Sequence, residues 1–353
     1  MNDIIIRRIT EMNDNIKRAL SFYDINVSST ESLNHNDSFK ITDNADNRYF
    51  LKLCGIKNDD DVFSSGRNYH TYEQLQIESE ILLMLSDSVC KTAVPIKNKN
   101  GDFVTTLALD TDGEPIFATI TSFIDGLVKG FKEAPTAEMA YISGVSAARL
   151  HLESQKSLLP IAVKRPHKKQ DYVRKMQDHI KQGIEIGSLT AAQYEMVSQC
   201  CDILEDCMSQ LDKDPENNVG LVHADILNSN IVYSQNQGTL IDFSRCVYSY
   251  YLFDLAEMCL HADFGGGNPD LQNAILRGYH SVKPLDKDHL YAMQVLFVMF
   301  ILTLMALFIN DKGSAWLDGV LKWFTNDVHP CLASGKGYMK PSVYENILKG
   351  QAT

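Results

Sequence analysis

The chain has 353 residues, of which 44% are apolar and 22% charged, as is typical of a globular protein with a large core or two lobes. Its formal net charge of −12 argues against a general nucleic-acid binder, because such a protein needs a basic surface. The 8 cysteines form no CxxC pair, and the apolar run at the start is too short for a secretion signal. We therefore expect a cytoplasmic protein with reduced thiols.

The first third of the chain has the pattern of a small antiparallel sheet with one helix. Alternating apolar residues and flanking turn residues predict strands at 38–43, 48–53, 102–110 and 115–124. Between them, residues 71–88 predict an amphipathic helix, since Leu75, Glu78, Leu82 and Leu85 recur at helical spacing. The pattern changes at Asp125-Gly126.

From about residue 135 onward the chain is mostly helical. Helices are expected at 136–153, 168–183, 190–211, 250–262, 269–280 and 286–309. The exception lies at 230–243, where "NIVYS" and "GTLIDF" flank the turn signal "QNQG" and predict a hairpin. The stretch 290–309 is almost wholly apolar and nearly long enough to cross a bilayer. We favour a buried core helix there and expect no membrane association.

These elements predict an α+β fold with two lobes. The N-lobe, residues 1–122, is a small antiparallel sheet with one helix, and the C-lobe, residues 123–353, is larger and helical. A ligand cleft between two such lobes is the default expectation.

The segment 221–244 carries the residues most suited to chemistry. His223, Asp225 and Asn230 form an H-x-D-x-x-x-x-N pattern, and Asp242-Phe243 follows the predicted hairpin. Phosphoryl transfer needs a carboxylate that orients the acceptor hydroxyl, together with an amide and a carboxylate that hold metal ions. Mg²⁺ prefers such oxygen ligands, and the hairpin can bring Asn230 and Asp242 to one end of a two-stranded ribbon. We expect Asp225 to be the catalytic carboxylate.

A phosphate-binding cation is then expected from the first lobe. Lys52 ends a strand among apolar residues, and a buried ammonium group needs a partner. Glu78 on the following helix is the best candidate, and Glu80, on a different helical face, is the alternative.

The sequence resembles the aminoglycoside phosphotransferase and choline kinase family, the small-molecule branch of the protein-kinase-like fold. The motifs are "LNHNDSFKI", "YFLKL", "IESEILLML", "TSFIDG", "VHADILNSN", "IDFS" and "YLFDLAEM", which together span most of the chain. The resemblance implies an ATP- and Mg²⁺-dependent kinase that phosphorylates a hydroxyl of a small molecule such as an aminoglycoside, choline, an amino acid or a sugar. It does not identify the acceptor, the preference for ATP over GTP, or the oligomeric state.

The resemblance also assigns roles to individual residues. It implies that Lys52 and Glu78 form the phosphate-binding pair and that Asn36 and Ser38 lie in the nucleotide loop. Main-chain groups around Ser122 and Ile124 would hold adenine. Asn230 and Asp242 would bind the metal ions, and Asp254 would be a structural anchor for the catalytic loop.

Three departures from the family pattern stand out. Ala224 follows the His where the family usually has Gly, Arg245 occupies an often acidic place, and residues 28–41 contain no Gly for a flexible phosphate clamp. A second His-Ala-Asp, at 261–263, lacks the following strand and hairpin, so we interpret it as a helix end near the substrate entrance.

Alternative functions are a bacterial-type protein Ser/Thr kinase and a pseudokinase that only binds ligand.

Overall fold

The computed structural model describes residues 14–33, 37–55, 71–109, 115–130, 133–263, 268–345 and 347. These residues form two compact units, the first ending at Asp125 and the second beginning at Gly126. The boundary predicted after residue 122 falls at the last residue of a strand, shortly before this division. The first unit combines a sheet with two helical segments, at 14–21 and 72–86, where one helix was predicted. The second unit is mainly helical, so the predicted α+β class is confirmed.

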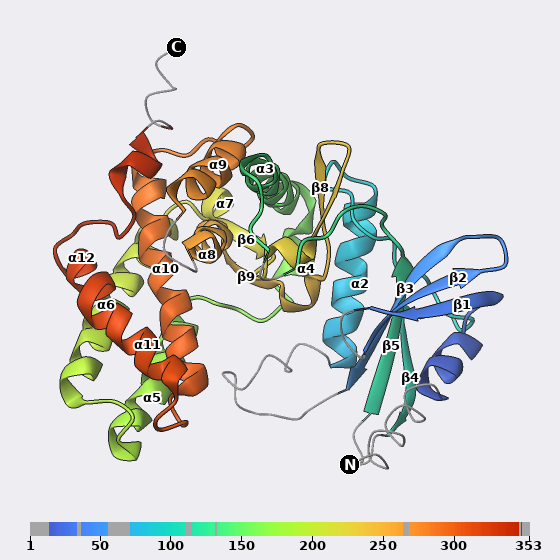
Figure 1. The fold of residues 1–353 in the computed structure, drawn as a ribbon, viewed down its shortest axis with the longest axis horizontal. Coiled ribbons are helices and arrows are strands. Elements are labelled where there is room, and N and C mark those ends of the chain that lie inside the picture. Colours follow the sequence, from blue (N-terminus) through green and yellow to red (C-terminus); the bar gives the residue numbers. More distant parts are fainter. Residues whose placement is uncertain are drawn as a thin grey trace. The chain divides into compact units, whose positions relative to one another are not determined.

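The first unit is built on a five-stranded antiparallel sheet with the order β1-β2-β3-β5-β4 (Figure 1). The strands are β1 Val27–Ser32, β2 Ser38–Asp43, β3 Arg48–Gly55, β4 Val104–Leu109 and β5 Pro115–Ser122. The four predicted strands are confirmed, whereas β1 was not predicted. Its sequence, VSSTES, is polar and all six residues are exposed, so no apolar alternation marks it as a strand.

Apolar side chains cover both faces of this sheet. On one face, Ile16 and Tyr23 pack with Phe39 and Leu51. On the other face, Leu75 of helix α2 (Tyr72–Ser86) packs against Cys54, Val104 and Phe117. Helix α2 begins where the Thr71 side chain accepts a hydrogen bond from the Gln74 N–H, which satisfies one of the first-turn donors.

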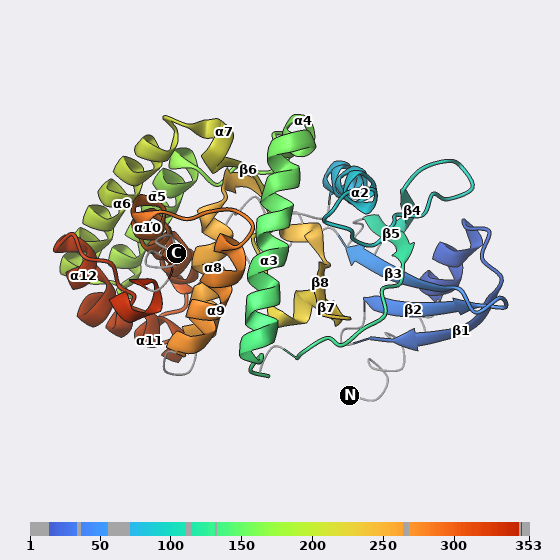
Figure 2. The same cartoon turned by 90° about the horizontal axis from the view of Figure 1, so that it is seen from above.

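The second unit consists largely of helices, several of which are packed side by side (Figures 1 and 2). They are α3 Ala137–Glu153, α4 Leu159–Ala162, α5 Gln170–Ile186, α6 Ala191–Leu211, α7 Pro215–Asn218, α8 Leu252–Asp263, α9 Pro269–His280, α10 Lys287–Phe308, α11 Ala315–Trp323 and α12 His329–Ala333. All six predicted helices are present, with ends shifted by a few residues at most. The predictions did not include α11 and α12, nor the short helices α4 and α7.

Two small antiparallel pairs lie among these helices. Strand β6 (Val219–Val222) pairs with β9 (Val247–Tyr250), and β7 (Ile231–Ser234) pairs with β8 (Gln237–Leu240). The second pair confirms the predicted hairpin. Its two loop residues, Gln235 and Asn236, both have positive φ angles, 47° and 61°, as a type I′ turn requires.

Helix α10 contains the apolar stretch noted in the sequence. It is the one helix in the described part of the chain that is long and apolar enough to cross a membrane, and 72% of its most apolar window is buried inside the protein. Thirteen of its residues, among them Val295, Leu296 and Met299, have buried side chains. The prediction of a core helix agrees with this burial.

Candidate active site

The loop between β6 and β7 carries His223 and Asp225 and is held in place by Asp254 of α8. The Asp254 carboxylate accepts the main-chain N–H of His223 at 2.9 Å and that of Ala224 at 2.7 Å. Ala224 has a φ of 57°, a left-handed conformation that costs a residue with a side chain about 1 kcal/mol or more. The two hydrogen bonds therefore stabilise a strained turn, and the expected anchoring by Asp254 is confirmed.

Asp254 is itself positioned by a buried chain of side chains. His151 Nε2 lies 2.9 Å from Asp254 Oδ2, and His151 Nδ1 lies 2.8 Å from the Tyr279 hydroxyl. Burial lowers the pKa of His151 although the Asp254 carboxylate opposes this, so the ring is neutral and donates from Nε2. Burial opposes ionisation of Asp254, but the hydrogen bond from His151 and the loop N–H groups lower its pKa below the ordinary value. The anchor is therefore an ionised carboxylate with its hydrogen bonds satisfied.

Asn230, at the end of the loop, is hydrogen-bonded to Asp225 near the start of the loop. Its Nδ2 donates to the Asp225 main-chain carbonyl at 2.9 Å and to the Asp225 carboxylate at 3.0 Å. Because the amide nitrogen is fixed in this way, the amide oxygen of Asn230 is directed away from Asp225. The Asp225 side chain is 17% exposed, and the guanidinium of Arg245 approaches it to 3.9 Å. The loop thus presents one carboxylate and one amide oxygen in a defined orientation.

Asp242 lies at the same end of the β7–β8 hairpin as Asn230. Ile231 pairs with Leu240, and the Ile241 N–H donates to the Asn230 carbonyl at 3.0 Å. Asp242 is exposed and has a left-handed backbone, with φ 59° and ψ 69°. Its Oδ1 accepts a hydrogen bond of 2.7 Å from the Ser244 hydroxyl. The hairpin therefore brings the two proposed metal ligands to neighbouring positions, as its turn signal indicated.

Arg165 supports the chain that follows Asp242 and was not predicted. Its guanidinium is buried and donates to the Cys246 carbonyl at 2.9 Å and to the Ser244 carbonyl at 2.7 Å. No local motif marks this arginine, because its partners lie about 80 residues away in sequence. Only the folded chain reveals the contact.

In the first unit, Lys52 and Glu78 lie on facing surfaces of β3 and α2. Lys52 pairs in the sheet with Ser38 and Thr119 and shares a strand face with Cys54, two residues further on. Cys54 packs against Leu75, and Glu78 lies one helical turn after Leu75. Both charged residues are half-buried. Their pairing stays a prediction.

The remaining predicted nucleotide contacts lie around β2 and β5. Ser38 opens β2, and its hydroxyl donates to the Asp37 side chain at 2.9 Å. The Ser122 N–H donates to the Val94 carbonyl, and the Ser122 hydroxyl accepts from the Val94 N–H. Ile124, just beyond β5, is half-buried. Asn36 lies outside the described residues.

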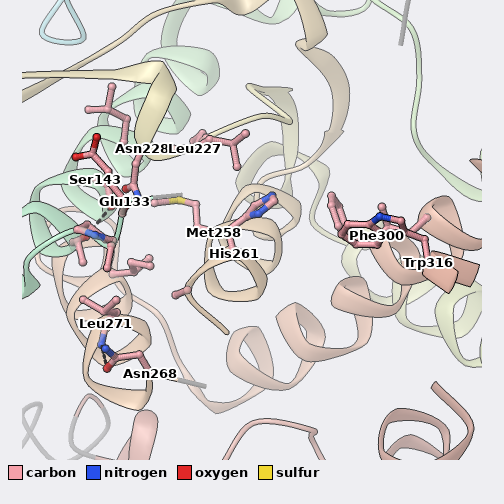
Figure 3. A pocket seen from close by; sticks show the side chains of 18 of the residues that line it. Glu133, Ser143, Leu227, Asn228, Met258, His261, Asn268, Leu271, Phe300 and Trp316 are labelled. Carbon is pink, nitrogen blue, oxygen red and sulfur yellow. Dashed lines mark hydrogen bonds between the residues drawn. The ribbon is translucent and has the colours of Figure 1, made fainter. Parts of the chain in front are cut away.

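A cavity of about 970 Å³ opens in the second unit beside the Asp225 loop (Figure 3). The residues directly after Asp225, Ile226 to Asn228, form part of its wall. Most of the remaining wall comes from α8, α9, α10 and α11 and includes Met258, Phe300 and Trp316. His261 of the second His-Ala-Asp also lines the cavity, and its expected place near the substrate entrance stays a prediction. The structure does not describe the side chain of Asp263.

The chain belongs to the phosphotransferase enzyme family, whose sequence model matches residues 27–291. This match spans the strands of the first unit, the Asp225 loop and most of the cavity wall. The chain is therefore a phosphotransferase, and the family suspected from its motifs is confirmed. No curated protein matches the chain by sequence.

Solved structures of small-molecule kinases share the fold. A microcompartment-associated aminopropanol kinase superposes with a TM-score of 0.70 at 18% identity, covering 92% of this chain and 98% of its own. An amicoumacin kinase in complex with AMP-PNP, Ca²⁺ and Ami gives 0.70 at 16% identity, covering 98% and 100%. Spectinomycin phosphotransferase in complex with ADP and spectinomycin gives 0.54 at 17% identity, covering 89% and 94%. At these identities the likeness concerns the fold.

Proposed function

We propose that the protein transfers the γ-phosphoryl group of ATP to a hydroxyl group of a small molecule in a Mg²⁺-dependent reaction. The observation that carries this proposal is the arrangement of the 223–242 segment. There Asp254 fixes the loop, Asn230 binds Asp225, and the hairpin sets Asp242 beside Asn230. A carboxylate next to an amide and a second carboxylate is the set of groups that phosphoryl transfer requires.

Asp225 is proposed to orient the acceptor hydroxyl and to receive its proton. One oxygen, Oδ2, is held by the Asn230 amide, so the carboxylate has a fixed direction. The Arg245 guanidinium lies 3.9 Å from the other oxygen, Oδ1. A positioned base of this kind contributes roughly a hundred- to ten-thousandfold to the rate.

Asn230 and Asp242 are proposed to hold Mg²⁺. The donor set fits a hard cation, because the Asn230 nitrogen is engaged by Asp225 and its oxygen is left to face a ligand. A bound Mg²⁺ would neutralise charge on the phosphate oxygens. The Ser244 hydroxyl, bound to Asp242 Oδ1, keeps the carboxylate in one orientation.

In the first unit, Lys52 is proposed to bind the α- and β-phosphates, with Glu78 positioning its ammonium group. Placement on the facing surfaces of β3 and α2 supports this pair over Lys52 with Glu80. Ser38, Asn36 and main-chain groups near Ser122 and Ile124 complete the proposed nucleotide contacts. The nucleotides named in the complexes of the amicoumacin kinase and the spectinomycin phosphotransferase support nucleotide use here. We further propose that the enzyme acts in the cytoplasm.

The test is transfer of labelled γ-phosphate from Mg·ATP by the wild type and by Asp225→Asn. The asparagine keeps an oxygen for the Asn230 hydrogen bond, so the loop is preserved while the proton acceptor is lost. We expect the turnover number to fall about a hundredfold or more, with nucleotide binding retained. Asp206→Asn, an exposed position on α6, is the matched control and should leave turnover unchanged.

The acceptor panel separates the competing functions. It should contain aminoglycosides, choline, amino acids, sugars and phenyl-substituted alcohols, with generic protein substrates assayed in parallel. Label that appears in a small molecule and depends on Asp225 supports the proposal. Label in protein alone would favour a protein kinase, and equal turnover by wild type and Asp225→Asn would refute the role of Asp225.

A further inference from the structure

The chemistry of the cavity beside Asp225 carries information about the acceptor that the motifs do not. Its volume of about 970 Å³ is at the upper end of the range for drug-sized ligands. Because its wall continues directly from the Asp225 loop, a molecule bound here would extend from the reacting hydroxyl into the cavity. The wall would then contact the part of the acceptor that does not react.

That wall is mainly apolar and aromatic. Phe300, Leu304, Leu307 and Phe308 of α10 line it together with Trp316 of α11. The Phe308 and Trp316 rings are stacked, with centroids 6.3 Å apart and planes at 12°. Trp316 is nevertheless 59% exposed and Leu307 is 38% exposed, so this part of the wall presents apolar surface that a ligand can cover.

Charged groups are scarce in the same wall. Among the described lining residues, Glu133 is the one carboxylate, its side chain is 60% exposed, and Lys129 pairs with it at 3.3 Å. Figure 3 shows Glu133 at the opposite end of the cavity from Trp316, with Met258 and His261 between them. Burial lowers the pKa of His261 to about 4, so this imidazole is neutral at physiological pH. A polycation that entered this cavity would lose hydration and would meet, among the described lining residues, a single carboxylate that already pairs with Lys129.

We propose that the acceptor is an alcohol whose non-reacting part is apolar or aromatic, and that the cavity lined by α8, α9, α10 and α11 discriminates against polycationic aminoglycosides. This inference rests on the proposed function, because it assumes that the bound molecule is the one phosphorylated. The class of molecule that the cavity holds can nevertheless be measured by binding alone. The side chains of Phe300, Leu304, Leu307 and Trp316 would contact the apolar part, and the polar groups of Asn228 and His261 would lie nearer the reacting end.

Binding can be read from Trp316 itself. The chain has 2 tryptophans, Trp316 and Trp323, so Trp323→Phe leaves a single fluorophore in the cavity wall. This full-length variant is titrated with phenethyl alcohol, choline and kanamycin, without nucleotide. We expect saturable fluorescence change with phenethyl alcohol and much weaker or no response to the two cations. Tighter binding of kanamycin or choline would overturn the proposal.

A matched pair of leucines tests whether the cavity is responsible. Leu307 lines the cavity and Leu152 on α3 does not, yet both are 38% exposed and both lie near the end of a helix. In the Trp323→Phe background, Leu307→Gln should weaken phenethyl alcohol binding by roughly tenfold, whereas Leu152→Gln should not change it. Equal affinities for the two variants would overturn the proposal, and equal thermal midpoints would exclude misfolding as the cause.

Phosphate transfer to the same compounds is measured separately with the wild type. Binding of phenethyl alcohol that depends on Leu307, combined with no transfer to any member of the panel, would contradict the proposed function and leave the chemistry of the cavity supported. Transfer to kanamycin but not to the phenyl-substituted alcohols would support the proposed function and overturn this inference.

Discussion

Glu257 on α8 is a buried carboxyl group close to the Asp225 loop, and its ionisation is opposed by its surroundings. Its side chain is 3% exposed, and its Oε2 has no hydrogen-bond partner among the described residues. Burial and then the negative charges of Asp225 and Asp254 raise its pKa from 4.5 to about 8, although Lys168 and Arg245 act in the other direction. The carboxyl group is therefore protonated at neutral pH.

This shift predicts a pH dependence of stability that Glu257→Gln should remove. The folded state holds the proton up to about pH 8, whereas the unfolded chain releases it near pH 4.5. Stability from this group is present below pH 4.5 and is lost as the pH rises through about 8, by up to ~1.4 kcal/mol per pH unit. Glutamine mimics the neutral form, so the variant should lose less stability over this window.

The measurement is urea unfolding of wild type and Glu257→Gln at intervals between pH 5 and 9. Glu195→Gln, at an exposed position of α6, is the control and should follow the wild type. If the free energies of unfolding of wild type and Glu257→Gln change in parallel across the whole pH range, the folded protein does not hold Glu257 in its protonated form.

At the level of elements, α3 and α9 approach each other so closely that glycine is required at the contact. A Cβ atom on Gly144 of α3 would lie 2.0 Å from the main-chain carbonyl oxygen of Ile275, and one on Gly278 of α9 would lie 2.0 Å from that of Tyr141. Both neighbours are backbone atoms, which cannot move aside as a flexible side chain does. The same two helices hold His151 and Tyr279, so this contact determines the spacing of the hydrogen-bond chain that ends at Asp254.

Gly144→Ala is therefore expected to destabilise the second unit although alanine favours helices. Overpacking at a close contact costs about 1–3 kcal/mol, which exceeds the gain in helix propensity of up to ~1 kcal/mol. Gly319→Ala in α11 is the matched control, because a Cβ atom there meets nothing within 4 Å. It should raise the free energy of unfolding by about 0.5–1 kcal/mol.

Both tryptophans lie in the second unit, so their fluorescence reports the unfolding of that unit. A more stable Gly144→Ala variant would contradict the close approach.

Across the whole molecule, the features that could be predicted from the sequence are those set by neighbouring residues. Asn230 and Asp242 flank one hairpin, so its turn signal indicated that they come together, and Asp225 precedes Asn230 by only five residues. The long helices followed from their apolar periodicity. The cavity wall could not be predicted, because Met258, Phe300 and Trp316 come from three separate helices and each is an ordinary apolar residue in its own helix.

The departures from prediction have the same cause. Strand β1 is polar and exposed along its whole length, so it depends on pairing with β2 and not on burial of its own side chains. Helix α11 is nine residues long, and the predictions left it out. Arg165 and Glu257 matter through distant partners, which a single sequence does not display.

A ligand that binds only the folded protein must stabilise it, and this gives a prediction for the whole molecule. At a concentration 100 times its dissociation constant, Mg·ATP should raise the free energy of unfolding of the protein that binds it by about 2.7 kcal/mol. If Asp242 is a metal ligand, Asp242→Asn should lose much of this stabilisation, since an amide is a weaker ligand for Mg²⁺ than a carboxylate. EDTA should reduce the stabilisation of the wild type toward the level of the variant.

Thermal unfolding followed by tryptophan fluorescence measures this in the second unit, where Asp242 and both tryptophans lie. Asp206→Asn serves as the control for loss of one carboxylate at an exposed site. Stabilisation of wild type and Asp206→Asn by Mg·ATP, with little in Asp242→Asn, assigns the metal to the end of the β7–β8 hairpin. If Asp242→Asn is stabilised as strongly as the wild type and EDTA has no effect, nucleotide binds without metal at Asp242, and the proposed roles of Asp242 and Asn230 are wrong.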